Sequence, residues 1–267
     1  MKANSCFRNI SLNPSAQIRL LCFPYAGSSS SIFDSWRDQI DSHIELLAYE
    51  LPGRGSRFCE PAFYSLEHIL EELTFEVEKY LDKPIALFGH SNGSLIAYEL
   101  AYILQTRFNK VCDHVFLSAR KSASIAHKGK HLHSLNDESL ISELRTLGGT
   151  PEEVLNNADL LSIILPIIRA DFSISETYCF KNRLELHSNY SLFRGSEDHH
   201  VNIEQLIRWR ELFSGFGQEY VFPGDHFFIH SHQHQLVNKI NESLTTMVNG
   251  FSIPSRYAEV CFKEVIN

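Results

Sequence analysis

The feature that most constrains the fold of this chain is a serine flanked by glycines, in the pentapeptide Gly89-His90-Ser91-Asn92-Gly93. The apolar run PIALF precedes it and the apolar pattern LIAYELAYIL follows it. This order predicts a buried strand, a sharp turn and a buried helix, with the serine on the turn. Its hydroxyl then projects above a sheet, beside a helix N-terminus that stabilises negative charge. The alternative is a glycine-rich structural turn with an incidental serine.

The rest of the chain alternates short apolar segments with helical patterns, as expected for βαβ units and a parallel sheet. We expect strands at residues 17–23, 44–50, 84–88, 114–118, 189–193 and 218–222. We expect helices at residues 31–40, 65–81, 92–106, 137–147, 203–213 and 232–247. The fold class is therefore α/β, with a mostly parallel central sheet of the α/β-hydrolase type.

A long segment interrupts this alternation between the expected strands 114–118 and 189–193. It spans about 70 residues, more than one crossover helix requires. Its pattern is mostly helical, broken by GGTP at 148–151 and by Pro166. We interpret residues 121–185 as a helical lid inserted into a single domain that covers residues 1–267. The alternative is two ordinary crossover helices with long loops.

A nucleophilic serine needs a base and a group that orients the base, in the chain order Ser, acid, His. His226, in FPGDHFF, follows an apolar strand at its carboxyl end, where open α/β sheets place their active sites. Asp198 and Glu197 both lie in a polar loop after the preceding strand, and we favour Asp198 as the acid. Asp225 is adjacent to His226, and adjacent side chains usually point apart.

Composition argues against several other classes of function. The formal net charge of −8 argues against a nucleic-acid partner. The cysteines are scattered without a CxxC pair, and His230, His232 and His234 do not share one helix face, so we expect neither a metal nor a cofactor. Single cysteines, no secretory signal and no run of ~20 apolar residues favour a cytoplasmic protein without a membrane partner. We expect a monomer.

Seven segments in order resemble the stand-alone type II thioesterases of polyketide and nonribosomal peptide synthesis, to which the vertebrate fatty-acid thioesterase II is related. They are LCFPYAG at 21–27, LPGRG at 51–55, LFGHSNG at 87–93, LSAR at 117–120, LGGTP at 147–151, LPIIRADF at 165–172 and FPGDHFF at 222–228. The resemblance implies an α/β-hydrolase core with a helical lid. It also implies a catalytic triad of Ser91, Asp198 and His226, the same residues that the chain order favours.

The resemblance further implies an oxyanion hole made by backbone N–H groups of Asn92 and of the turn at Tyr25 and Ala26. The turn FPYAGSSS follows the first expected strand, where an exposed backbone can aim donors at a developing oxyanion. The alternative is a turn that merely joins strand to helix. The chain departs from the family at Asn92, where methionine is usual, and at Ser28, where a second glycine is usual.

The implied activity is hydrolysis of acyl thioesters on the phosphopantetheine arm of an acyl- or peptidyl-carrier protein, which removes stalled or misprimed acyl groups. The apolar composition of the expected lid indicates an apolar acyl channel. Docking of an acidic carrier to this acidic chain would require a local basic or apolar patch, for which residues 120–130 are the candidate. The alternatives are a medium-chain fatty acyl-carrier thioesterase, a general serine carboxylesterase and a non-catalytic carrier-binding module.

Overall fold

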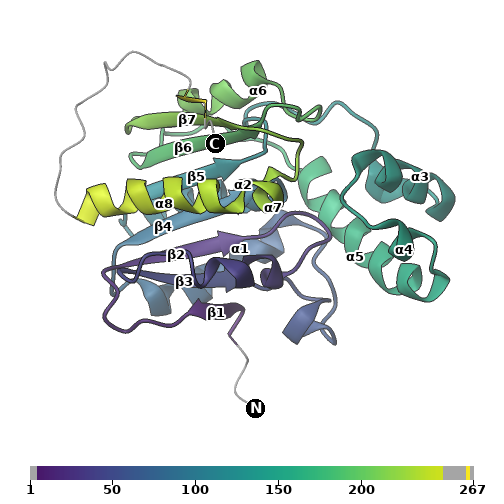
Figure 1. The fold of residues 1–267 in the computed structure, drawn as a ribbon, viewed down its shortest axis with the longest axis horizontal. Coiled ribbons are helices and arrows are strands. Elements are labelled where there is room, and N and C mark those ends of the chain that lie inside the picture. Colours follow the sequence, from purple (N-terminus) through teal and green to yellow (C-terminus); the bar gives the residue numbers. More distant parts are fainter. Residues whose placement is uncertain (1–4, 249–262, 265–267) are drawn as a thin grey trace.

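A central sheet crosses the molecule in the order β1-β3-β2-β4-β5-β6-β7-β8 (Figure 1). The structure, a computed structural model, describes residues 5–248 and 263–264. β1 pairs with β3 in the antiparallel sense, and every other neighbouring pair is parallel, which confirms the predicted fold class. The strands are β1 (Phe7–Ser11), β2 (Ile18–Phe23), β3 (Ile44–Tyr49), β4 (Ile85–His90), β5 (His114–Ser118), β6 (Asn189–Gly195), β7 (Gly217–Phe222) and β8 (Lys263–Glu264).

Helices cover both faces of the sheet, and alternating strand residues supply two apolar cores. On β4, Leu87 packs into the core formed with α1 and α2, and Phe88 packs into the core formed with η1 and α8. None of the described helices has the length and apolar character needed to cross a bilayer. The α-helices are α1 (Leu66–Val77), α2 (Asn92–Arg107), α3 (Asp137–Leu147), α4 (Glu152–Leu155), α5 (Ala158–Glu176), α6 (Ile203–Ile207), α7 (Phe228–Ser231) and α8 (Gln233–Val248). The 3₁₀ helices are η1 (Ser30–Trp36), η2 (Gly55–Arg57), η3 (Glu78–Tyr80), η4 (Leu132–Ser134) and η5 (Arg208–Leu212).

The segment between β5 and β6 contains α3, α4 and α5, which lie together to one side of the sheet (Figure 1). They share a third apolar cluster, to which Leu140, Leu144 and Ile168 contribute. α3 ends at Gly148, whose φ of 73° is the left-handed conformation that glycine adopts readily. The expected interruption at Pro166 is wrong, because α5 continues through that residue. Buried contacts of Leu165 and Ile168 on either side of the proline hold the helix together.

Two further differences from the expected elements have local causes. The expected helix at 31–40 is the shorter 3₁₀ helix η1, in a stretch whose serines hydrogen-bond in place of regular helix contacts. Ser30 donates both its N–H and its hydroxyl to the buried Glu50 carboxylate, at 3.0 and 2.7 Å. β1 was not expected at all. It is an edge strand with a register irregularity, so its sequence lacks a clean alternation of apolar and polar residues.

A buried histidine makes the stability of this fold depend on pH. His114 begins β5, where its ring stacks on Phe116 at 4.2 Å between centroids and its Nε2 lies 2.9 Å from the Ser191 hydroxyl. Burial lowers the pKa of His114 to about 3. The folded state therefore keeps this imidazole neutral in the range where an unfolded chain protonates it.

We predict that protein stability falls as pH decreases below about 6.5, the ordinary histidine pKa, because the unfolded chain then binds protons that folded His114 does not. This residue alone contributes a slope of about 1.4 kcal/mol per pH unit. A His114→Gln variant should lose that part of the slope, whatever its absolute stability. Urea denaturation of both proteins between pH 4.5 and 7.5 measures it, and parallel curves would contradict the prediction.

Candidate active site

Ser91 sits on a strained turn between the end of β4 and the start of α2. Its backbone has φ 53° and ψ −114°, and its N–H donates to the Ser118 carbonyl at 2.8 Å. The two flanking glycines are required by close packing. A Cβ at Gly89 would lie 2.1 Å from the Gly93 carbonyl oxygen, and one at Gly93 would lie 2.0 Å from that of Phe23. The turn can therefore form only with glycine at both positions.

The structure brings Asp198 and His226 together from the loops after β6 and β7. His226 Nδ1 lies 2.9 Å from Asp198 Oδ2, and Asp198 Oδ1 accepts the N–H groups of His200 at 2.8 Å and Val201 at 3.1 Å. Burial by itself would raise the pKa of the Asp198 carboxyl. The hydrogen bond and charge of His226 and the two N–H donors outweigh burial, so that this pKa lies below its usual value. Asp198 is thus an anion that holds the imidazole by one nitrogen.

The competing acids lie elsewhere. Glu197 is exposed on the same loop, and the carboxylate that pairs with His226 is that of Asp198. Asp225 uses its carboxylate to accept the Phe227 N–H at 2.8 Å, within its own turn. Of the acids that sequence alone left open, Asp198 is therefore the one that the fold places against His226.

A second, buried histidine links the serine turn to His226. His90 Nε2 lies 2.9 Å from the His226 carbonyl oxygen, which can only accept, so this nitrogen carries the proton. His90 Nδ1 then accepts from the Ser118 hydroxyl at 2.8 Å. Burial, followed by the charge of His226, lowers the pKa of His90 well below its usual value. His90 thus stays neutral and fixes the backbone of His226 beside β4.

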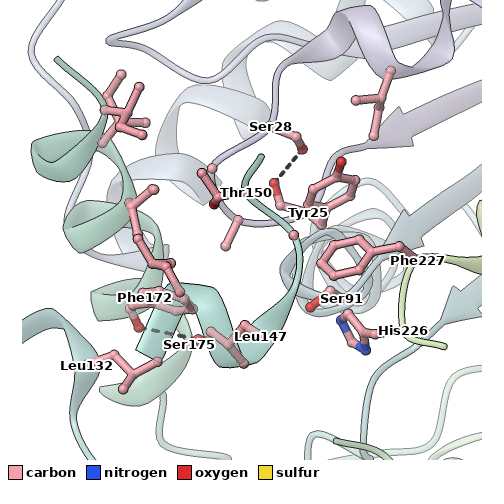
Figure 2. A pocket seen from close by; sticks show the side chains of 18 of the residues that line it. Tyr25, Ser28, Ser91, Leu132, Leu147, Thr150, Phe172, Ser175, His226 and Phe227 are labelled. Atoms are coloured by element: carbon pink, nitrogen blue, oxygen red, sulfur yellow. Dashed lines mark hydrogen bonds between the residues drawn. The ribbon is translucent and has the colours of Figure 1, made fainter. Parts of the chain in front are cut away.

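The Ser91 and His226 side chains lie next to each other at the same end of the sheet (Figure 2). Because Asp198 engages Nδ1 of His226, the free Nε2 is the nitrogen available to the serine. The Ser91 hydroxyl has no hydrogen-bond partner among the described residues and is free to rotate. Such looseness is common in active sites without substrate, where catalytic hydrogen bonds tighten on binding.

Backbone N–H groups in the turn after β2 and at the start of α2 are candidate donors to an oxyanion. The N–H groups of Tyr25, Ala26 and Asn92 have no acceptor among the described residues. The turn that contains the first two is closed by Ser28, whose N–H and hydroxyl donate to the Tyr25 carbonyl at 3.1 and 2.6 Å (Figure 2). Ser28, which replaces a glycine usual in this motif, thus stabilises the turn through its hydroxyl.

An ion pair that sequence reasoning missed joins the inserted helices to this turn. Asp171 on α5 receives two hydrogen bonds from Arg54, at 2.6 and 2.7 Å, and one from the Gly27 N–H at 2.6 Å. The Asn92 side chain donates to the Asp171 carbonyl at 2.6 Å. Asp171 and Arg54 are both buried. No sequence spacing indicated these contacts, because Arg54 and Asp171 lie in different motifs far apart in the chain.

A cavity of about 900 Å³ opens onto Ser91 and His226. The inserted helices supply most of its apolar wall, and Figure 2 shows Leu147 and Phe172 facing it. The apolar lining from α3, α5 and the segment between them includes Leu144, Leu147, Val154, Ile163, Ile164, Ile167, Ile168 and Phe172. The site therefore offers an apolar chain a place beside the serine hydroxyl.

One histidine cluster has the composition of a metal site. One ligand atom each from His131, His133 and Glu176 lie within 4.8 Å of one another. The Glu176 carboxylate already accepts the N–H of Leu132 at 2.8 Å and of His133 at 3.2 Å, and it pairs with His133 Nδ1 at 2.5 Å. These hydrogen bonds attach η4 to the end of α5, which gives the cluster a structural role.

The histidines near α8 have separate partners. His230 Nε2 lies 2.9 Å from the Tyr25 hydroxyl, His232 Nδ1 lies 3.0 Å from the Ser231 hydroxyl, and His234 Nδ1 lies 3.2 Å from Asn238 Nδ2. Among the described residues, these three histidines are not part of a group of ligand atoms close enough to hold a metal ion.

The chain is similar to known thioesterases in sequence and in fold. The Gramicidin S biosynthesis protein GrsT of Aneurinibacillus migulanus is 36% identical over 236 residues, which cover 88% of this chain and 92% of that protein. The medium-chain S-acyl fatty acid synthase thioesterase of Rattus norvegicus is 32% identical over 81% of this chain and 83% of its own. The solved type II thioesterase BorB, from the borrelidin biosynthetic cluster, superposes with a TM-score of 0.83 at 29% identity, over 91% and 99% of the two chains. The Thioesterase domain model matches residues 18–244, and the chain belongs to this family.

Proposed function

We propose that this protein hydrolyses acyl thioesters carried on the phosphopantetheine arm of a carrier protein, and so removes stalled or misprimed acyl groups in polyketide or nonribosomal peptide biosynthesis. The observation on which the proposal rests is the Asp198–His226 pair beside Ser91, at the floor of an apolar cavity. The family and the similarity to GrsT and BorB support the substrate class. In this function the enzyme is a cytoplasmic monomer that meets a mobile carrier.

In the proposed mechanism, His226 removes the proton of Ser91 as its oxygen attacks the thioester carbonyl carbon. The carbonyl oxygen becomes negative and accepts the N–H groups of Ala26 and Asn92, with that of Tyr25 nearby. The carbon–sulfur bond then breaks and the sulfur leaves as a thiol, taking the proton that His226 removed from Ser91; this needs little assistance because a thiolate is a good leaving group. Water, deprotonated by His226, hydrolyses the acyl ester of Ser91 and restores the free serine.

The inserted helices act as the lid in this scheme, within one domain that spans residues 1–267. Their apolar side chains hold the acyl group, and the basic stretch 120–130, with Lys128 and Lys130 exposed, is the proposed carrier contact. A medium-chain fatty acyl-carrier thioesterase is the second candidate, favoured by the similarity to the rat enzyme. The two candidates share the chemistry and differ in carrier and acyl length.

Hydrolysis of an acyl-loaded carrier protein, compared with the same acyl group on coenzyme A and as a p-nitrophenyl ester, tests the function. We expect the carrier thioester to be hydrolysed with the highest kcat/KM. Ser91→Ala should lower kcat by about 10⁴-fold or more, while the variant still binds the loaded carrier. Activity restricted to oxyesters, or retained by the variant, would contradict the proposal.

Asp198→Asn should lower kcat by about 10³- to 10⁴-fold with little change in KM. The amide cannot stabilise the imidazolium form of His226, and it can leave the proton on the wrong nitrogen. Glu197→Gln is the matched control, because that carboxylate lies on the same loop and is exposed. Steady-state kinetics of both variants measure the effect, and a larger loss in the control would assign the acid to Glu197.

Asp171→Asn should lower kcat by about 10- to 100-fold, because the turn that carries the Tyr25 and Ala26 donors loses its charged anchor. It should also destabilise the fold by about 3 kcal/mol, since Arg54 is left buried without its counterion. Asp137→Asn removes an exposed lid carboxylate that pairs with Arg169, and should change both quantities little. Kinetics at a temperature where circular dichroism shows both variants folded are decisive, and a wild-type kcat in folded Asp171→Asn would refute the role.

A further inference from the structure

An arginine without a carboxylate partner lies in the wall of the cavity, close to the nucleophile. Arg120 Nη1 donates to the Asn92 side-chain oxygen at 3.3 Å, and Arg120 Nε is buried without an acceptor. Its Nη2 also lacks an acceptor among the described residues, and no acidic group of that part of the chain forms an ion pair with it. Burial lowers the pKa of Arg120 to about 10, so the side chain remains a cation at neutral pH.

Other interior arginines of this protein are neutralised. Arg54 pairs with Asp171 at 2.6 Å, Arg57 pairs with Glu72 at 2.5 Å, and Arg183 pairs with Glu99. A partly buried cation without a counterion is unfavourable, because neither water nor an opposite charge compensates it fully. A ligand that brings a negative charge to Arg120 would supply the missing partner, and a guanidinium is well suited to bind a carboxylate by two parallel hydrogen bonds.

The next residue adds a second positive charge to the same wall. Lys121 also lines the cavity, and within the described part of the chain its ammonium group donates only to the Ala126 carbonyl, at 3.1 Å. Its pKa is lowered by burial and then by the charges of Arg120 and Lys128. This part of the cavity is therefore electropositive.

The cavity carboxylates are already engaged. Glu143 pairs with Lys130 at 2.6 Å, and Glu176 accepts the two backbone N–H groups and the His133 side chain described above. They are therefore not positioned to neutralise Arg120.

We propose that Arg120, assisted by Lys121, binds a carboxylate at the far end of the acyl chain, so that carboxyacyl thioesters are a preferred substrate class. The inference rests on the proposed thioesterase function and extends it. Arg120 contacts Asn92, the residue directly after the nucleophile, and it lines the same cavity as Ser91, so a group bound to Arg120 lies in the cavity that opens onto the serine. The phosphate of a phosphopantetheine arm is separated from the sulfur by two amide units and a branched diol, which favours the acyl carboxylate.

Binding to a Ser91→Ala protein tests the site without requiring turnover. The probes are N-acetylcysteamine thioesters of glutaric acid and of its neutral mono-amide, which have the same shape and contain no phosphate. Calorimetry should show about tenfold tighter binding of the carboxylate, as a charge-assisted pair predicts. Adding Arg120→Met should abolish this difference, and Arg120→Lys should retain part of it. Equal affinities for the two probes in the Ser91→Ala protein would overturn the proposal.

The same pair of thioesters gives a kinetic test in the enzyme with Ser91 present. The ratio of kcat/KM for the carboxylate over the amide should fall about tenfold in Arg120→Met, and it should persist in the control Arg208→Met, an exposed arginine that pairs with Glu211 and does not line the cavity. Because a ratio is compared within each variant, a general loss of activity cancels. An unchanged ratio in Arg120→Met would overturn the subsite.

Further outcomes distinguish a failure of the carboxylate site at Arg120 from a failure of the proposed thioesterase function. If neither thioester is hydrolysed but the Ser91→Ala protein still prefers the carboxylate, the proposed function fails and the anion site is supported. If both are hydrolysed with the same ratio in wild type and Arg120→Met, the function stands and the site is refuted. If Arg120→Met changes only the preference for coenzyme A over N-acetylcysteamine thioesters of one acyl group, Arg120 binds phosphate and the acyl assignment is overturned.

Discussion

The close packing of β4, α2 and β2 around Ser91 is the constraint on which the rest of the site depends. Gly89 and Gly93 lie so close to backbone oxygens that neither position has room for a Cβ. This approach holds Ser91 in a sparsely populated conformation whose cost the surrounding sheet offsets. A hydrogen bond from the buried His90 to the His226 carbonyl holds His226 beside that turn. Asp198 in turn hydrogen-bonds to the His226 ring.

Both polar and apolar contacts place the inserted helices on the sheet, since Ile174 of α5 belongs to the core that the sheet forms with α1 and α2. Their own apolar cluster is separate from the two cores of the sheet. Asp171 connects α5 to Arg54, to the Gly27 N–H and, through its carbonyl, to the Asn92 side chain. The helix that covers the cavity is therefore bonded to both segments that carry the proposed oxyanion donors. Under the proposed function, the position of the lid and the geometry of the oxyanion hole are physically coupled.

The contacts with α5 explain what the side chain of Asn92 does at a position where the resemblance leads one to expect methionine. A methionine at this position could fill space, but it could not donate to the Asp171 carbonyl or accept from Arg120 as the amide does. The substitution therefore adds two polar contacts at the base of the cavity. One of these contacts holds the guanidinium of Arg120, which has no ion-pair partner among the described residues, against the residue that follows Ser91.

Several elements could be predicted because their cause is local. β5 and α3 have the expected bounds, since each is a compact apolar or amphipathic pattern with clear ends. Edge strand β1 was missed because only part of it is buried, and Pro166 misled because packing of the neighbouring apolar residues outweighs one lost hydrogen bond. The pattern favoured Asp198 over Glu197 without deciding between them, since adjacent acids in one loop differ mainly in where the folded backbone points them.

The sequence by itself determined the strand–turn–helix around Ser91, because glycine and apolar periodicity act over a few residues, and it indicated the chain order of the proposed nucleophile, acid and base. Only the tertiary structure showed that Asp198 meets His226, that Arg54 pairs with Asp171, and that Arg120 has no counterion among the residues described. These are contacts between segments far apart in the chain. Their partners depend on how the sheet and the inserted helices pack in three dimensions, and spacing along the chain does not encode that.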